Sequence, residues 1–234
     1  MLSGSSALAQ FKLDVAPEYF YWQEDVNGAK VMDNSGFRIG LEASYEQPKE
    51  KGWLSATRFK LYYGEVDYDG QTWGGTPLKT TTDYYGGLLE ERYGYRWGLG
   101  EKQYLDLMGG IGLDFWLRSL NGPGGYNEYW LPIYLKAGLE VSPKETGWIG
   151  TLGVKAAVYT TQIADFGRMG GGTVTVHPGT MPSGYAEAGY KFTKNLSAAV
   201  FFDSYWFSKS SMESGVYQPE SKSYEVGVKV GWTF

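Results

Sequence analysis

The last twelve residues of the chain alternate between two kinds of side chain. One parity is apolar or aromatic and holds Tyr224, Val226, Val228, Val230, Trp232 and Phe234. The other parity is small or polar and holds Ser223, Glu225, Gly227, Lys229, Gly231 and Thr233. Because successive side chains of a β-strand point to opposite faces, this pattern predicts a strand with one apolar and one polar face. An aromatic residue at the end of the apolar face is typical of a membrane interface.

The same alternation recurs along the chain and predicts ten strands, at residues 10–22, 36–46, 52–65, 80–97, 103–117, 130–141, 148–159, 184–192, 196–207 and 223–234. Five long connections, at residues 23–35, 66–79, 118–129, 160–183 and 208–222, alternate with four short ones, at 47–51, 98–102, 142–147 and 193–195. Long and short connections therefore gather at opposite ends of the predicted sheet. An outer-membrane barrel has this asymmetry, with short periplasmic turns and long external loops.

Two strands break the alternation. In strand 80–97, Glu91 shares the apolar parity of Leu89 and Tyr93. One extra residue in a strand reverses its parity, so we predict a β-bulge near Glu90–Glu91. Strand 196–207 carries aromatic residues on both parities, which leaves its register open.

The alternating aromatics Trp232 and Phe234 resemble the closing strand of the small bacterial outer-membrane β-barrels, although Lys229 stands where that family usually has a glycine. The resemblance is one of architecture and covers residues 10–234. It implies an all-β protein, namely a ten-stranded antiparallel up-and-down transmembrane β-barrel. It also implies a place in the outer membrane of a Gram-negative bacterium, in contact with the lipid bilayer and with lipopolysaccharide.

Residues 1–9 are expected to lie outside this domain. Ala7-Leu8-Ala9 has the small-x-small form of a cleavage site, which predicts the remnant of a signal peptide with Gln10 as the mature start. An artificial leader is the alternative.

Composition agrees with a membrane barrel. Aromatic residues make up 17% of the chain, with 20 Tyr and 9 Trp, which we interpret as girdles at two membrane interfaces. No apolar run reaches the roughly 18 residues of a membrane helix, so a crossing would have to be made by strands. The net charge of −5 argues against a nucleic-acid partner. The alternative is a soluble barrel, in which the same alternation would be turned inside out.

The polar parity of the strands carries ten basic and ten acidic side chains, which we predict to face the lumen and to pair across it. The residues expected to control permeation are Arg38, Arg58, Lys60, Arg92, Asp106, Asp114, Lys136 and Glu140.

The sequence offers little for catalysis, and we predict that the protein is not an enzyme. Its one histidine, His177, has Gly179 two residues later, so it lacks the His-x-Ser pattern of outer-membrane lipases. The omptin proteases also have ten strands and use an Asp–His pair with a pair of aspartates at the outer rim. Asp165 precedes His177 in one predicted loop, but no adjacent acidic pair matches. Without cysteine or a His/carboxylate cluster, neither a metal nor a cofactor is expected.

Two functions remain open. In the first, the barrel is a narrow passive channel for ions or small polar solutes. In the second, the lumen is closed by its salt bridges, and the long external loops bind a partner protein or a surface, as in an adhesin. The interior of a barrel widens as the number of strands grows, and eight strands give an interior filled by side chains. A barrel of ten strands is therefore expected to be nearly closed.

Overall fold

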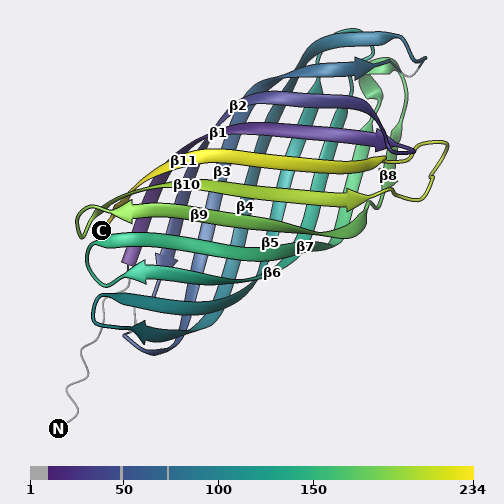
Figure 1. Cartoon of the computed structure of the whole chain (residues 1–234). Coiled ribbons are helices and arrows are strands. Elements are labelled where there is room, and N and C mark those ends of the chain that lie inside the picture. The colour runs from purple at the N-terminus through teal and green to yellow at the C-terminus, as the bar shows by residue number, and fades with distance from the viewer. Residues whose placement is uncertain (1–9, 48–49, 73) are drawn as a thin grey trace.

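The computed structural model describes residues 10–47, 50–72 and 74–234, and in these residues ten long strands form a closed antiparallel barrel (Figure 1). The strands are β1 (Gln10–Val26), β2 (Ala29–Glu46), β3 (Gly52–Gln71), β4 (Pro77–Leu99), β5 (Gln103–Leu120), β6 (Asn127–Pro143), β7 (Gly147–Asp165), β9 (Gly179–Lys191), β10 (Leu196–Ser208) and β11 (Glu220–Thr233). A short strand β8 (Thr173–Val176) pairs with β7 alone, and a single 3-10 turn, Gly167–Met169, precedes it. The prediction of a ten-stranded antiparallel barrel is confirmed. The predicted leader, residues 1–9, lies outside the described residues.

The barrel closes where the first and last strands meet. β1 pairs with β2 on one side and with β11 on the other, with Leu13 opposite Trp232 and Val15 opposite Val230. The start of β1 and the C-terminus therefore lie at the same end of the barrel (Figure 1). We call this the proximal end, and the opposite end, which carries the connections β1–β2, β3–β4, β5–β6, β7–β9 and β10–β11, the distal end.

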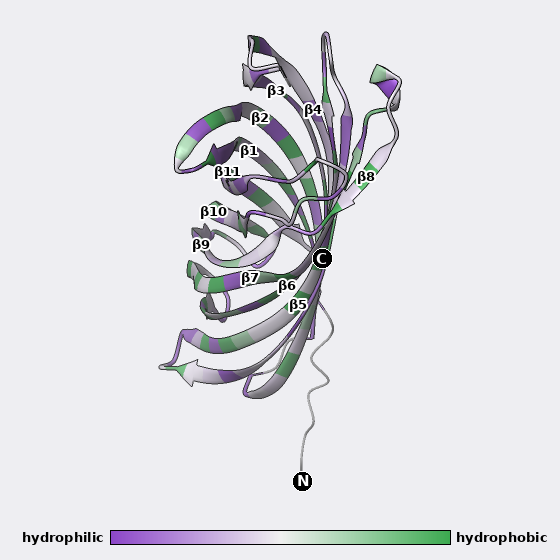
Figure 2. Cartoon of the chain, turned by 90° about the vertical axis from the view of Figure 1, so that its right-hand side faces the viewer, coloured by the Kyte–Doolittle hydropathy of each residue, from purple (hydrophilic) through white to green (hydrophobic). Residues whose placement is uncertain are grey.

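The apolar parity points outward. Figure 2 shows hydrophobic and hydrophilic segments alternating along the strands. Large apolar side chains are exposed around the whole barrel, among them Phe37, Leu41, Leu89, Leu152 and Val226. A soluble protein does not leave such a continuous apolar surface in water. The predicted orientation toward lipid is confirmed, and the soluble, inside-out barrel is rejected. Among the described residues no helix is long and apolar enough to span a membrane.

The strands reach further toward the distal end than the sequence pattern predicted. β1 and β2 continue through most of the predicted loop 23–35 and meet at a two-residue turn, Asn27-Gly28. Both turn residues have positive φ, 53° and 78°, as tight hairpin turns require. A tilted membrane crossing needs about 9–11 residues, whereas β4 has 23. The surplus residues raise the distal end of the barrel above the apolar band.

The predicted bulge at Glu90–Glu91 is wrong. β3 and β4 stay in continuous register there, with Arg58 opposite Glu90 and Thr57 opposite Glu91. Glu91 therefore keeps the outward parity, and the Thr57 hydroxyl donates to its carboxylate at 2.5 Å. The register shifts lie elsewhere, at Glu24/Asp25, Ile133/Tyr134 and Asp203/Trp206. The last of these lies in β10, the strand whose register the sequence left open.

Candidate functional site

The interior of the barrel is divided along its axis into three parts. A cavity of about 650 Å³ occupies the proximal half, and a smaller one of about 250 Å³ lies under the distal connections. Between them lies a layer of ion pairs and aromatic rings, in which one small void has a volume of about 10 Å³. The two larger cavities have no lining residue in common.

The ion pairs of the central layer form a quartet of two cations and two carboxylates. Arg38 donates from Nε and Nη2 to Glu18 Oε1, at 2.9 and 2.6 Å, and from Nη2 to Glu225 Oε1 at 2.6 Å. Lys60 Nζ lies 2.6 Å from Glu18 and 3.5 Å from Glu225. The guanidinium carbon of Arg38 also sits 4.0 Å from the centre of the Phe20 ring. The quartet is neutral, with Arg38, Lys60 and Glu18 buried and Glu225 partly exposed, and neutrality is the condition under which burying such charges is tolerated.

Aromatic rings fill the lumen on the distal side of this quartet. Trp116 stacks on Trp130, with ring centroids 5.4 Å apart and planes at 9°, and Trp22 meets both rings edge-on. The whole buried cluster holds Phe20, Trp22, Met32, Tyr62, Val66, Tyr68, Tyr84, Leu88, Trp116, Leu120, Trp130, Tyr134, Ala157, Tyr205 and Phe207. Many aromatic residues interpreted as membrane girdles are therefore core residues inside the barrel.

Glycines make room for two of these rings. A Cβ on Gly112 would lie 2.1 Å from Cζ of Tyr134, and a Cβ on Gly86 would lie 2.3 Å from Cζ of Tyr62. The tyrosines thus lie flat against the neighbouring strand and carry their hydroxyls to buried carboxylates. Tyr134 donates to Glu90 at 2.7 Å, and Tyr62 donates to Asp114 at 3.0 Å.

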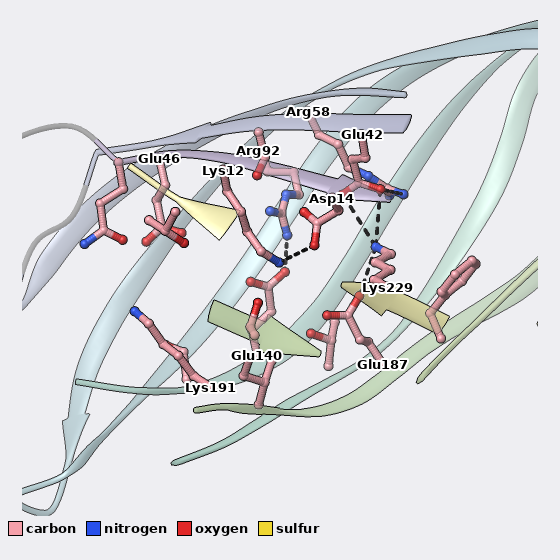
Figure 3. A pocket seen from close by; sticks show the side chains of 18 of the residues that line it. Lys12, Asp14, Glu42, Glu46, Arg58, Arg92, Glu140, Glu187, Lys191 and Lys229 are labelled. Atoms are coloured by element: carbon pink, nitrogen blue, oxygen red, sulfur yellow. Dashed lines mark hydrogen bonds and ion pairs between the residues drawn. The ribbon is translucent and has the colours of Figure 1, made fainter. Parts of the chain in front are cut away.

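The proximal cavity is lined by charges of both signs (Figure 3). Eight lining residues are basic and eight are acidic. Arg58 pairs with Glu42 at 2.7 Å, and Lys229 bridges Glu42 and Glu187 at 3.3 and 3.0 Å. Lys191 faces the same space without an ion pair among the described residues. The cavity as a whole carries no net charge that would select one sign of ion.

The eight residues predicted to control permeation all point into the interior, at different heights. Arg58, Arg92, Lys136 and Glu140 line the proximal cavity, where Arg92 pairs with Glu140 and Lys136 lies 3.1 Å from Glu90. Asp106 pairs with Arg96 at 2.6 Å. Arg38 and Lys60 belong to the central quartet, and Asp114 accepts from the hydroxyls of Tyr62 and Tyr205 beside it. Their role in permeation stays a prediction.

The distal cavity was missed by sequence reasoning, because its polar residues fall in segments predicted as loops. Four of the five distal connections contribute to its wall through Thr72, Pro123, Phe166 and Gln218, and the ends of β1 and β2 contribute through Val26 and Val31. Its polar lining includes Glu24 near the end of β1, Glu128 near the start of β6, and Gln162 near the end of β7. Charged side chains inside a predicted loop gave no signal that they would meet across a barrel.

The catalytic chemistry sought in the sequence does not assemble. His177 Nδ1 lies 3.1 Å from the carbonyl oxygen of Thr160, and the His177 ring packs against Tyr159. Over the described ranges His177 forms no ion pair with Asp165 or any other carboxylate, and no group of three side chains could hold a metal ion. That the protein is not an enzyme stays a prediction.

No protein-family model matches the chain, and no curated protein sequence matches it. Among solved structures, the outer membrane protease OmpT from Escherichia coli is similar, with a TM-score of 0.65 and 12% identity over 100% of this chain and 99% of that chain. Neisserial surface protein A matches at a TM-score of 0.43 and 12% identity, over 96% and 97% of the two chains. The COG4313 outer membrane channel from Pseudomonas putida F1 matches at 0.40 and 11%, over 99% and 98%. At such identity the likeness to OmpT is one of fold.

Proposed function

We propose that this protein, which has the fold of the small bacterial outer-membrane β-barrels and resides in the outer membrane, is a closed barrel that binds ligands at its external end. The proximal end, with its short turns, the start of β1 and the C-terminus, then faces the periplasm, as in barrels of this architecture. The distal end stands above the membrane and presents the two-residue β1–β2 turn and the other four distal connections to the outside. This is the second of the two functions that the sequence left open.

The filled centre of the lumen is the observation that carries the proposal. A passing ion would have to cross the quartet of Arg38, Lys60, Glu18 and Glu225 and then the stacked rings of Trp116 and Trp130. Buried pairs of this kind are rigid because breaking one leaves an uncompensated charge, at a cost of about 3–5 kcal/mol. Aromatic cores are close-packed in the same way as any protein interior. Both features oppose the rearrangement that conduction would need.

The distal end supports the proposal that the barrel binds ligands at its external end. Four of the five distal connections, together with the ends of β1 and β2, surround one pocket of about 250 Å³, whose lining combines apolar residues with a few polar groups. Ligand pockets in proteins typically have this composition. A structural barrel with no ligand would have no need to keep such a space open above a filled core.

A narrow passive channel for ions or small polar solutes is the second candidate. The proximal cavity of about 650 Å³ favours it, since this charged, water-accessible space would form the proximal part of a path for ions. In that case the ion pairs of Arg58, Arg92, Lys136 and Glu140 would set the conductance.

Single-channel conductance of the refolded protein in planar bilayers distinguishes the two. We expect the wild type to be silent and the variant Trp116→Ala/Trp130→Ala/Arg38→Ala/Glu18→Ala to conduct, because it removes the stacked rings together with one ion pair of the quartet. Arg58→Ala is the matched control, since it removes a proximal charge and leaves the centre filled; it should be silent. Reproducible steps from the wild type that change with Arg58→Ala would overturn the proposal in favour of the channel.

A further inference from the structure

We propose that the distal cavity binds a small organic cation, namely a protonated primary amine carried on a compact apolar or aromatic body. This assignment rests on the proposed function, because it names the class of ligand for the external end of the closed barrel. Three features of the cavity carry it: an excess of negative charge, a buried acceptor without a donor, and apolar walls.

The negative charge comes from Glu24 and Glu128. They are the charged residues among those described as lining the cavity, and both are buried. One guanidinium nitrogen serves both, since Arg118 Nη1 donates to Glu24 Oε1 at 3.3 Å and to Glu128 Oε2 at 2.9 Å. Two carboxylates stand against one guanidinium, and burial raises the pKa of Glu24, so a second cation is needed to keep both carboxylates charged. Buried charges are normally paired, so this site calls for a further cation.

Arg118 is the cation already counted against these two carboxylates, so a second positive charge must come from another group. Its Nε donates to Asn34 Oδ1 at 3.1 Å, while Nη1 is already shared between the two glutamates. The indole nitrogens of Trp22 and Trp130 donate to Glu24 and Glu128, at 3.1 and 3.0 Å. These neutral donors hold the carboxylates in place but bring no charge. A carboxylate oxygen has two lone pairs, which leaves each glutamate able to accept from a ligand.

The acceptor without a donor is Gln162. Its side chain is 3% exposed, and its Oε1 has no hydrogen-bond partner in the described part of the chain. Gln162 lies opposite Trp130 in the β6–β7 register, and Glu128 is two residues from Trp130 on the same face. The unpaired oxygen therefore lies on the same wall as one of the carboxylates. Leaving a buried acceptor unpaired is unfavourable, and a donating ligand would supply the missing hydrogen bond.

An ammonium group fits these acceptors. Its three hydrogen-bond donors equal the number of acceptor side chains, namely Glu24, Glu128 and Gln162. Its one positive charge is opposite in sign to the two carboxylates. A carboxylate ligand would instead face two carboxylates, and a neutral hydrocarbon would leave Gln162 unpaired. The rest of the lining, which includes Val31, Met32, Leu78, Leu120, Phe166 and Val176, provides contacts for an apolar body.

Three ligands of similar shape test the assignment: 2-phenylethylamine, 2-phenylethanol and 3-phenylpropionate, titrated calorimetrically into the refolded protein in detergent micelles. We expect the amine to bind at least tenfold more tightly than the alcohol, and the acid not to bind. Gln162→Leu and Glu128→Gln should each weaken amine binding about tenfold or more, since a hydrogen bond to a charged group is worth about 1.5–3 kcal/mol. Glu187→Gln, a carboxylate variant in the proximal cavity, is the matched control and should leave amine binding unchanged.

The outcomes separate this inference from the proposed function. Binding of the acid as tightly as the amine would overturn the amine assignment, as would amine binding that is unchanged in folded Gln162→Leu and Glu128→Gln proteins. A wild type that is silent in bilayers and binds no amine would also reject the assignment while leaving the barrel closed. Wild-type conductance with amine binding intact would reject the closed barrel and keep the ligand class.

Discussion

The central quartet offers a quantitative test of how the barrel is closed. Replacing Arg38 with Met removes the guanidinium and its three hydrogen bonds to Glu18 and Glu225 while keeping an apolar side chain of similar length. Lys60 is then the remaining cation of the quartet, 2.6 Å from Glu18 but 3.5 Å from Glu225. The quartet changes from neutral to a net charge of −1, and the uncompensated charge falls mainly on Glu225.

The expected cost follows from the burial of the site. The side chains of Arg38 and Glu18 are 2% and 0% exposed and that of Glu225 is 16% exposed, so solvent can offset only a small part of the uncompensated charge. Breaking a buried pair by removing one partner costs about 3–5 kcal/mol. Adding Glu225→Gln to Arg38→Met restores neutrality, so we expect the double variant to recover about 2 kcal/mol relative to the sum of the two single changes, within the range of coupling seen for residues in one network.

The measurement is the free energy of unfolding in guanidinium chloride, followed by tryptophan fluorescence of the protein in lipid vesicles. The four proteins are the wild type, Arg38→Met, Glu225→Gln and the double variant. Lys79→Met is the control, because its ion pair with Asp69 is largely exposed and should change stability by less than about 1 kcal/mol. If the two single effects simply add to within about 0.5 kcal/mol, then Arg38 and Glu225 are not coupled and our account of the central layer fails.

Three further changes test other parts of the fold by the same unfolding assay. Glu91→Leu should raise the free energy of unfolding by about 1 kcal/mol or more, because a carboxylate on the lipid face is costly; a loss of stability would place Glu91 away from lipid. Gly112→Ala should destabilise the barrel by about 1–3 kcal/mol through overpacking against Tyr134, and an unchanged midpoint would contradict the close approach seen there. Gly28→Ala should cost roughly 1 kcal/mol, because φ at this turn residue is 78°, and a neutral result would show that the turn can change type.

The aromatic residues show where sequence reasoning ended. Alternation placed Tyr19 and Tyr21 on the outer face of β1, and both are consistent with a girdle. It placed Phe20 and Trp22 on the inner face, where a uniformly polar lumen was expected, yet both are buried in the central cluster. Parity separates inside from outside, but it does not say what fills the inside at each height. That depends on which strands face one another across the barrel.

Glu91 shows a different kind of failure. Its parity was read correctly from the sequence, but a charge facing lipid was judged implausible and a bulge was invoked to remove it. The structure instead gives Glu91 a local partner, the hydroxyl of Thr57 on the neighbouring strand. Strand pairing supplied a hydrogen bond that no pattern within one strand could reveal.

The sequence by itself determined the number of barrel strands, the parity that is apolar in most of them, and the shared end at which the first strand begins and the last one finishes. These features depend on the two-residue period of a strand and on turn residues, which are local properties of the chain. Tertiary structure decided the rest. Arg38 meets Glu18 and Glu225, which are 20 and 187 residues away, and Glu24 meets Arg118 from 94 residues away. Such contacts follow from barrel closure and strand stagger, because these set the height at which side chains from distant strands meet.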